Sequence, residues 1–225
     1  MPTPKYIDLR KRLNDLKSIL LDPRLAKASL NRAQIDQVLA FALLSHAACE
    51  EFVEERCGQL AADAISKFQN QKFFGRVARH LCILPFIQVP RDRSELRKIE
   101  AVVGCSGFGI KAGKNFTLSY YNQIHDLLEL GYKRYKKSIE KNHGIRQQYQ
   151  FKLMAVIGLD RNKLGPTFSS RIEQLANLRG EAAHKATVSV TTIPEPSDLV
   201  TWTTDLIKGF RLLDTELTRL GNRSF

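Results

Sequence analysis

The stretch NRAQIDQVLAFALLSHAACEEFV, residues 31–53, decides the fold class. Its apolar residues recur at steps of three and four, which is the spacing of one face of an α-helix. Asn31 stands where an N-cap side chain accepts hydrogen bonds from the first free backbone N–H groups of a helix. We therefore expect a long helix that begins after Asn31 and continues towards Phe68. Its stripe consists of Ile35, Val38, Leu39, Ala42, Leu43, His46, Cys49 and Val53.

The same periodicity extends over most of the chain. A first helix, from Tyr6 to Leu20, is expected to stop at Asp22-Pro23. Further helices are expected over 73–84, 120–142 and 145–157, over 166–185 with Pro166 as the opening residue, and from Ser197, as N-cap, to the C-terminal end. One weak strand candidate, TVSVTTIP at 187–194, interrupts them. The sequence thus predicts an all-α protein built as a helical bundle.

The glycine-rich stretch GCSGFGIKAGKN, residues 104–115, is the clearest internal break. A phosphate-binding P-loop requires G-x-x-x-x-G-K-[ST], but Phe108 occupies the first glycine position and Asn115 follows Lys114. We therefore expect a flexible connector. The 225 residues allow one large domain or two small ones. Our prediction is a single helical domain, 1–225, with a basic helical segment at 116–158 as a candidate insertion.

Composition narrows the class of protein. Apolar residues make up 43% and charged residues 26%, as in ordinary soluble domains. Lys and Arg number 35 against 23 Asp and Glu, and this net charge of +12 favours a polyanionic partner, either nucleic acid or an anionic membrane surface. The longest apolar run, 38–49, is far shorter than the roughly 20 residues of a membrane span. No membrane span is therefore expected, and of the two polyanionic partners our prediction is RNA and not a membrane.

The N-terminus and the cysteines indicate the compartment. The first 21 residues carry charges throughout and have no small-residue cleavage site, so they do not resemble a secretory signal. Cys49, Cys57, Cys82 and Cys105 include no C-x-x-C pair. We expect reduced, mostly buried thiols in a cytoplasmic protein, with no metal site and no cofactor.

The most informative segment for function is SRIEQLANLRGEAAHKA, residues 170–186. Within it, Arg179 and His184 form an R-x-x-x-x-H pattern framed by Leu175, Leu178 and Ala183. This frame resembles the signature of the HEPN superfamily of all-α ribonucleases and nucleotide-binding domains, especially the stand-alone members of prokaryotic defence and toxin loci. The direct match covers these 17 residues, and the helical layout extends the likeness less specifically.

The two motif residues suit metal-independent RNA cleavage. The 2′-hydroxyl of RNA can attack the adjacent phosphate, and an imidazole can remove or return its proton near neutral pH. A guanidinium can hold the non-bridging oxygens in a bidentate manner and stabilise the developing charge. The resemblance assigns these roles to His184 and Arg179, with a cyclic phosphate and a free 5′-hydroxyl as products.

Arg179 and His184 are five positions apart, which corresponds to about 140° around a helix and 7.5 Å along it. The two side chains do not share one stripe. The resemblance implies a homodimer in which two motifs form one composite cleft, and Gly180 would allow close approach there. The sequence departs from the family in two places: Gly180 lacks the polar side chain that often follows the arginine, and Ala186 replaces the tyrosine that is nucleotidylated in some toxins.

Two carboxylates are accessory candidates. Glu181 lies three residues before His184 on the same face, where it could orient the imidazole or pair with Lys185. Glu50 is a candidate because family members often place a polar residue of an early helix near the motif. His46, in the apolar stripe of the same early helix, is expected to be a hydrogen-bonded core residue.

A basic track, YKRYKKSIEKNHGIRQQYQFK at 132–152, holds seven Lys or Arg and one acid. Basic side chains give sequence-independent phosphate affinity, and interleaved aromatic rings can stack on unpaired bases. The alternative is a solvated helix face whose tyrosines reach out from the core. The candidate RNA-binding residues are Lys133, Arg134, Lys136, Lys137, Lys141 and Arg146.

These observations lead to an endoribonuclease of a prokaryotic defence or toxin–antitoxin system, with RNA and an antitoxin or other defence protein as partners. The main alternative is a non-catalytic HEPN-type module that binds RNA or protein through the same cleft. A helical scaffold with a structural Arg–His pair is the third.

Overall fold

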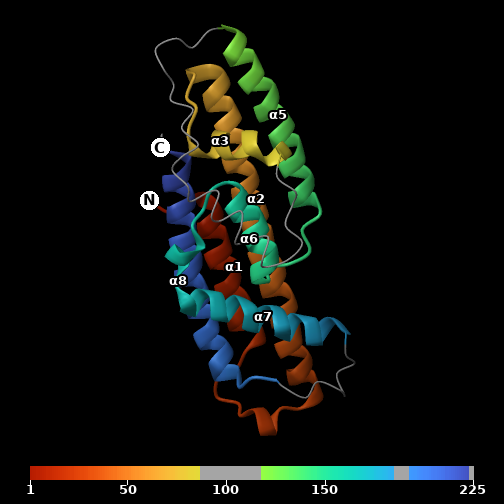
Figure 1. The fold of residues 1–225 in the computed structure, drawn as a ribbon. Coiled ribbons are helices and arrows are strands. Elements are labelled where there is room, and N and C mark those ends of the chain that lie inside the picture. The colour runs from red at the N-terminus through yellow and green to blue at the C-terminus, as the bar shows by residue number, and fades with distance from the viewer. Residues whose placement is uncertain (87–117, 185–192, 223–225) are drawn as a thin grey trace. The chain divides into compact units, whose positions relative to one another are not determined.

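The computed structural model describes residues 1–86, 118–184 and 193–222, and within these ranges the chain is α-helical without a β-strand (Figure 1). The prediction of an all-α protein is confirmed for this part of the chain. The seven α-helices described are α1 (Pro4–Leu20), α2 (Arg32–Gln71), α3 (Arg76–Ile83), α5 (Leu118–Glu140), α6 (Gln147–Val156), α7 (Pro166–His184) and α8 (Pro196–Gly221). Short 3-10 turns lie at η1 (Lys27–Ser29), η2 (Leu84–Phe86) and η3 (Arg161–Leu164).

Local capping explains the helix starts that the sequence predicts correctly. Asn31 Oδ1 accepts a hydrogen bond from the backbone N–H of Gln34 at 2.9 Å, and the Gln34 side chain accepts from the N–H of Asn31 at 2.9 Å. This reciprocal pair is a capping box, and α2 continues from it for 40 residues. Pro166 is the first residue of α7, a position at which proline loses no helical hydrogen bond.

Several predicted helix starts are wrong by one to three residues: α6, for example, begins at Gln147 rather than at Ile145. α3 begins at Arg76 rather than at Phe73, because Gly75 is its N-cap. Phe74, outside the helix, instead packs its ring 5.5 Å from that of Phe68. α8 begins at Pro196, so Ser197 is a helical residue and not the N-cap. The connector 104–115 and the β-branched residues 187–192 lie outside the described residues, as do Cys105 and Ala186.

The chain divides into two compact units. Unit 1 comprises Met1–Val53, Gly144–Gln147 and Leu164–Thr215, and unit 2 comprises the described parts of Glu54–His143, Gln148–Lys163 and Glu216–Phe225. The motif of α7 therefore belongs to unit 1, and the basic helix α5 to unit 2. The single helical domain with an insertion at 116–158 stays a prediction.

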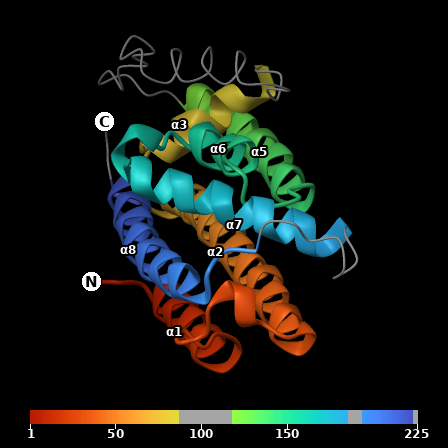
Figure 2. The same cartoon turned by 90° about the horizontal axis from the view of Figure 1, so that it is seen from below.

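Unit 1 positions α7 through an aromatic cluster. Phe210 of α8 meets Phe52 of α2 and Phe168 of α7 edge to face, with ring centroids 5.4 and 5.0 Å away. A Cβ at Gly209 would collide with the Phe168 ring, so only glycine lets α7 pack this closely on α8. Figures 1 and 2 show α7 running crosswise over the unit-1 parts of α2 and α8.

Unit 2 anchors α5 by one face. The Tyr135 hydroxyl, fully buried, donates to the backbone oxygen of Leu153 at 2.9 Å. Gly131 lies directly against the backbone of Leu81 in α3. The opposite face of α5 is therefore left for polar side chains.

Candidate functional site

The motif occupies the C-terminal turn of α7, where Arg179 and Glu181 are half-buried and His184 is the last helical residue. The helix is regular through this turn, so the 140° offset between positions five apart holds for Arg179 and His184. The side chain of His184 lies outside the described part of the structure. Other groups of unit 1 near Arg179 therefore define the site.

A buried histidine of α2 lies beside the motif. His46 is 4% exposed, and its Nε2 accepts a hydrogen bond from the backbone N–H of Ile145 at 3.4 Å. Because Nε2 is the acceptor, the neutral ring carries its proton on Nδ1. Nδ1 faces Glu50 Oε2 at 3.7 Å. The prediction that His46 is a hydrogen-bonded core residue is confirmed.

Two arginines affect the pKa of this imidazole. Burial, followed by the positive charges of Arg179 and Arg146, lowers the pKa of His46 to about 4. His46 is therefore neutral at physiological pH. It serves as a hydrogen-bond acceptor, not as a proton shuttle that works near neutral pH.

Arg146 lies over the motif itself. Its Nη2 atom is 3.7 Å from the position that a Cβ on Gly180 would occupy. That distance is ordinary van der Waals contact, so packing within the chain does not require glycine at position 180. The structure thus brings Arg146, Arg179, His46 and Glu50 together in unit 1. In the sequence, Arg146 is one of the seven basic residues of the track at 132–152, and no spacing pattern links it to His46 or Arg179.

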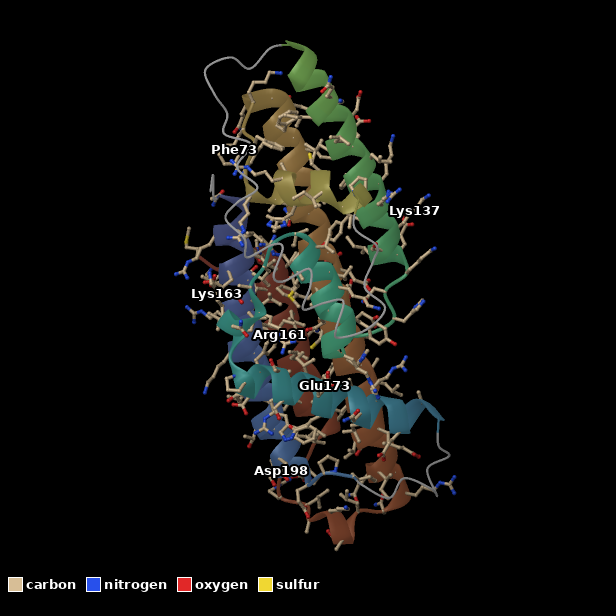
Figure 3. The ribbon with its side chains drawn as sticks, in the orientation of Figure 1. Phe73, Lys137, Arg161, Lys163, Glu173 and Asp198 are labelled. Atoms are coloured by element: carbon tan, nitrogen blue, oxygen red, sulfur yellow. The ribbon has the colours of Figure 1, made fainter. Side chains whose placement is uncertain are left out.

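The remaining track residues lie in unit 2, four of them on α5 and Lys141 directly after its last residue. Lys133, Arg134, Lys136, Lys137 and Lys141 are all exposed. Figure 3 shows the Lys137 side chain on the outer side of α5. These exposed residues make up the basic face of α5.

Local contacts and the burial of one aromatic residue modify the prediction that residues 132–152 form an RNA-binding track. Lys133 Nζ lies 3.7 Å from Glu129, and Arg134 donates to the Pro85 backbone oxygen at 2.7 Å. Tyr135 is completely buried and cannot stack on a base, so that part of the track prediction is wrong. Half-buried Tyr149 carries the Lys152 ammonium 5.7 Å above its ring.

We expect the basic face of α5 to make the affinity for single-stranded RNA strongly salt-dependent. Each contacted phosphate contributes about −0.7 to the slope of log K against log salt. Replacing Lys133, Lys136, Lys137 and Lys141 with Gln should flatten that slope. The same change at four exposed lysines of α1, η1 and η3, namely Lys5, Lys11, Lys27 and Lys163, should not. The measurement is a fluorescence-anisotropy titration at several salt concentrations. An unchanged slope would mean that the face is only solvated.

The three cysteines of the described residues do not offer a nucleophile. Burial raises the pKa of the Cys49 thiol well above its usual range, and that of Cys57 and Cys82 to about 12. All three are free thiols that stay protonated at neutral pH.

Two kinds of site were sought among the described residues: clustered metal ligands and membrane-spanning helices. Among residues 1–86, 118–184 and 193–222, no three His, Cys, Asp or Glu side chains are grouped so that they could hold a metal ion. Within the same ranges, none of the helices has the length and apolarity needed to cross a bilayer.

Comparisons with family models, with curated proteins and with solved structures find no match to this chain. The resemblance to HEPN proteins therefore rests on the motif residues alone. Any functional conclusion depends on the chemistry of the site.

Proposed function

We propose that this protein is a metal-independent endoribonuclease of HEPN type. The observation that carries the proposal is positive charge at the motif: Arg146 Nη2 lies beside Gly180, the residue after Arg179, in the turn where His184 ends α7, and both arginines lower the pKa of the buried His46. Positive charge gathered beside a histidine suits a phosphodiester, because the guanidinium groups stabilise the charge that develops at phosphorus.

The proposed reaction divides the work between the motif residues. His184 takes the proton of the 2′-hydroxyl as its oxygen bonds to phosphorus, and Arg179 holds the non-bridging oxygens. The bond from phosphorus to the 5′-oxygen breaks, and that oxygen receives a proton from an imidazolium. The products are a 2′,3′-cyclic phosphate and a free 5′-hydroxyl. Glu181 and Glu50 are accessory groups in this scheme, and Glu50 acts through His46.

The direct test is incubation of the purified protein with mixed RNA in the presence of EDTA. We expect fragments that polynucleotide kinase can label at the 5′ end without prior phosphatase treatment, because their 5′ ends are hydroxyls. The 3′ ends should resist polyadenylation until the cyclic phosphate is removed. A requirement for added magnesium would contradict the proposal.

We also propose that the active form is a homodimer in which α7 meets its copy at Gly180. A two-fold contact uses the same surface twice, so Gly180→Leu should weaken the dimer and cleavage together. Gly180→Ala, the matched small substitution, should leave both nearly unchanged, and His184→Ala should leave the dimer intact. Sedimentation velocity at micromolar concentration measures the assembly. A monomer that still cleaves RNA would contradict the composite cleft.

A non-catalytic RNA-binding module is the second candidate. The exposed basic face of α5 favours it, because that face can hold RNA without any reaction. Gly180 also favours a module without catalysis, because it lacks the polar side chain that often follows the arginine in HEPN proteins. In either case, we place the protein in the cytoplasm of a prokaryote, within a defence or toxin–antitoxin system that supplies a protein partner.

A further inference from the structure

We propose that Arg146 and Arg179 form a two-arginine clamp for one RNA phosphate, and that His46 positions Arg146 within it. The inference rests on the proposed function for the identity of the anion. It adds Arg146, which lies outside the motif, as a substrate-holding residue, and His46 as a positioning residue.

Two positive charges, those of Arg146 and Arg179, act near one buried imidazole. Arg146 reaches the surface of α7 at Gly180, directly after Arg179 in the chain. Both arginines act on the same buried imidazole. Within the described part of the chain, no carboxylate forms an ion pair with either guanidinium at hydrogen-bonding distance. Two such cations repel each other, and an anion bound between them relieves that repulsion.

The backbone that carries Arg146 is held in place. The short segment Gly144–Gln147 belongs to unit 1, and Gly144 adopts a φ of 135°, a conformation that favours glycine. Ile145 is fully buried, and its N–H donates to His46 Nε2 at 3.4 Å. The backbone next to Arg146 is therefore fixed to α2, whereas the Arg146 side chain itself is exposed.

Gly180 contributes no side chain to the surface that Arg146 reaches. Arg146 Nη2 lies 3.7 Å from the position that a Cβ at this residue would occupy. A guanidinium offers paired N–H groups that match two phosphate oxygens, so two of them can grip one phosphate from two sides. A lysine at position 146 would keep the charge and lose the paired geometry.

The test separates binding from cleavage by using a short single-stranded RNA with 2′-O-methyl groups, which lacks the nucleophile. We expect Arg146→Gln and Arg179→Gln each to weaken its binding by about tenfold, and Arg146→Lys to weaken it less. Arg211→Gln, which removes the same charge from an exposed position on α8, is the matched control. The double variant should lose less than the sum of the two single losses, because both arginines hold one phosphate.

The role of His46 is tested by a pair of variants. His46→Gln places an acceptor at the position of Nε2, and His46→Leu removes it. We expect the Gln variant to bind as the wild type does, and the Leu variant to bind as Arg146→Gln does, with no further loss when the two changes are combined. A folded His46→Leu protein with wild-type binding would overturn the positioning role. Because Arg146 is exposed, its own variants fold regardless of that result.

Two outcomes overturn the clamp: Arg146→Gln binding as tightly as Arg211→Gln, or losses in the double variant that simply add. The proposed nuclease fails separately. If ordinary RNA stays intact while the methylated strand binds in an Arg146-dependent manner, the endoribonuclease is wrong and the clamp stands. If RNA is cleaved and Arg146→Gln has no effect on binding or on KM, the clamp is wrong and the endoribonuclease stands.

Discussion

Replacing His184 with Ala, or Arg179 with Ala, is expected to lower the rate of RNA cleavage by about 10²-fold or more. The histidine variant loses the group that moves the 2′-hydroxyl proton, and the arginine variant loses a donor to the charged phosphoryl oxygens. Arg179 is only half-buried, so its replacement removes no fully buried side chain. Initial rates with a fluorogenic RNA, together with circular dichroism for the fold, give the measurement.

The two variants should differ in how they lose activity. His184→Ala should leave KM unchanged and lower kcat, because the imidazole acts on the proton in the transition state. Arg179→Ala should raise KM as well, since the guanidinium also holds the ground-state phosphate. His143→Ala, at an exposed position of unit 2, is the control and should retain full activity. A fully active His184→Ala protein would refute the assignment.

Local sequence signals predicted most of the described fold. The capping pair of Asn31 and Gln34 and the proline at 166 define helix starts by interactions within one turn, so their effect can be predicted without tertiary structure. The predicted start of α3 failed because Phe74 is held outside the helix by a tertiary contact with Phe68. At α8, Pro196 and Ser197 both suit a helix start, and the proline takes the first position.

The candidate site was less predictable, because its parts lie far apart in the sequence. The motif residues Arg179 and His184 follow from spacing and framing. The position of Arg146 follows instead from the turn at Gly144 and the hydrogen bond from Ile145 to His46. A polar residue in an apolar stripe indicated that His46 is buried, but its neighbours depend on how α2 and the 144–147 segment pack within unit 1.

Lowering the pH from 7 to 5 is expected to destabilise the protein through His46 by about 2 kcal/mol. The unfolded histidine has a pKa near 6.5, and burial together with Arg179 and Arg146 lowers the folded pKa to about 4. Between these two values the unfolded state binds a proton that the folded state does not. The contribution of His46 to the stability of the fold is therefore present above pH 6.5 and is lost as the pH drops towards 4. Urea unfolding at pH 7 and pH 5 measures the difference.

His46→Gln removes this titration and keeps an acceptor for Ile145, so its stability should change less between pH 7 and pH 5 than that of the wild type. His80, whose pKa burial and then Arg76 and Arg79 lower to about 4, adds a second loss of the same sign, and His80→Gln removes it separately. His143→Gln, an exposed control, should keep the wild-type pH dependence. Arg179→Gln tests whether Arg179 acts on His46. With this positive charge removed, the pKa of His46 in the folded protein should rise, and less folding stability should be lost near pH 4. If His46→Gln loses as much stability as the wild type on acidification, the buried neutral imidazole beside Arg146 and Arg179 is ruled out.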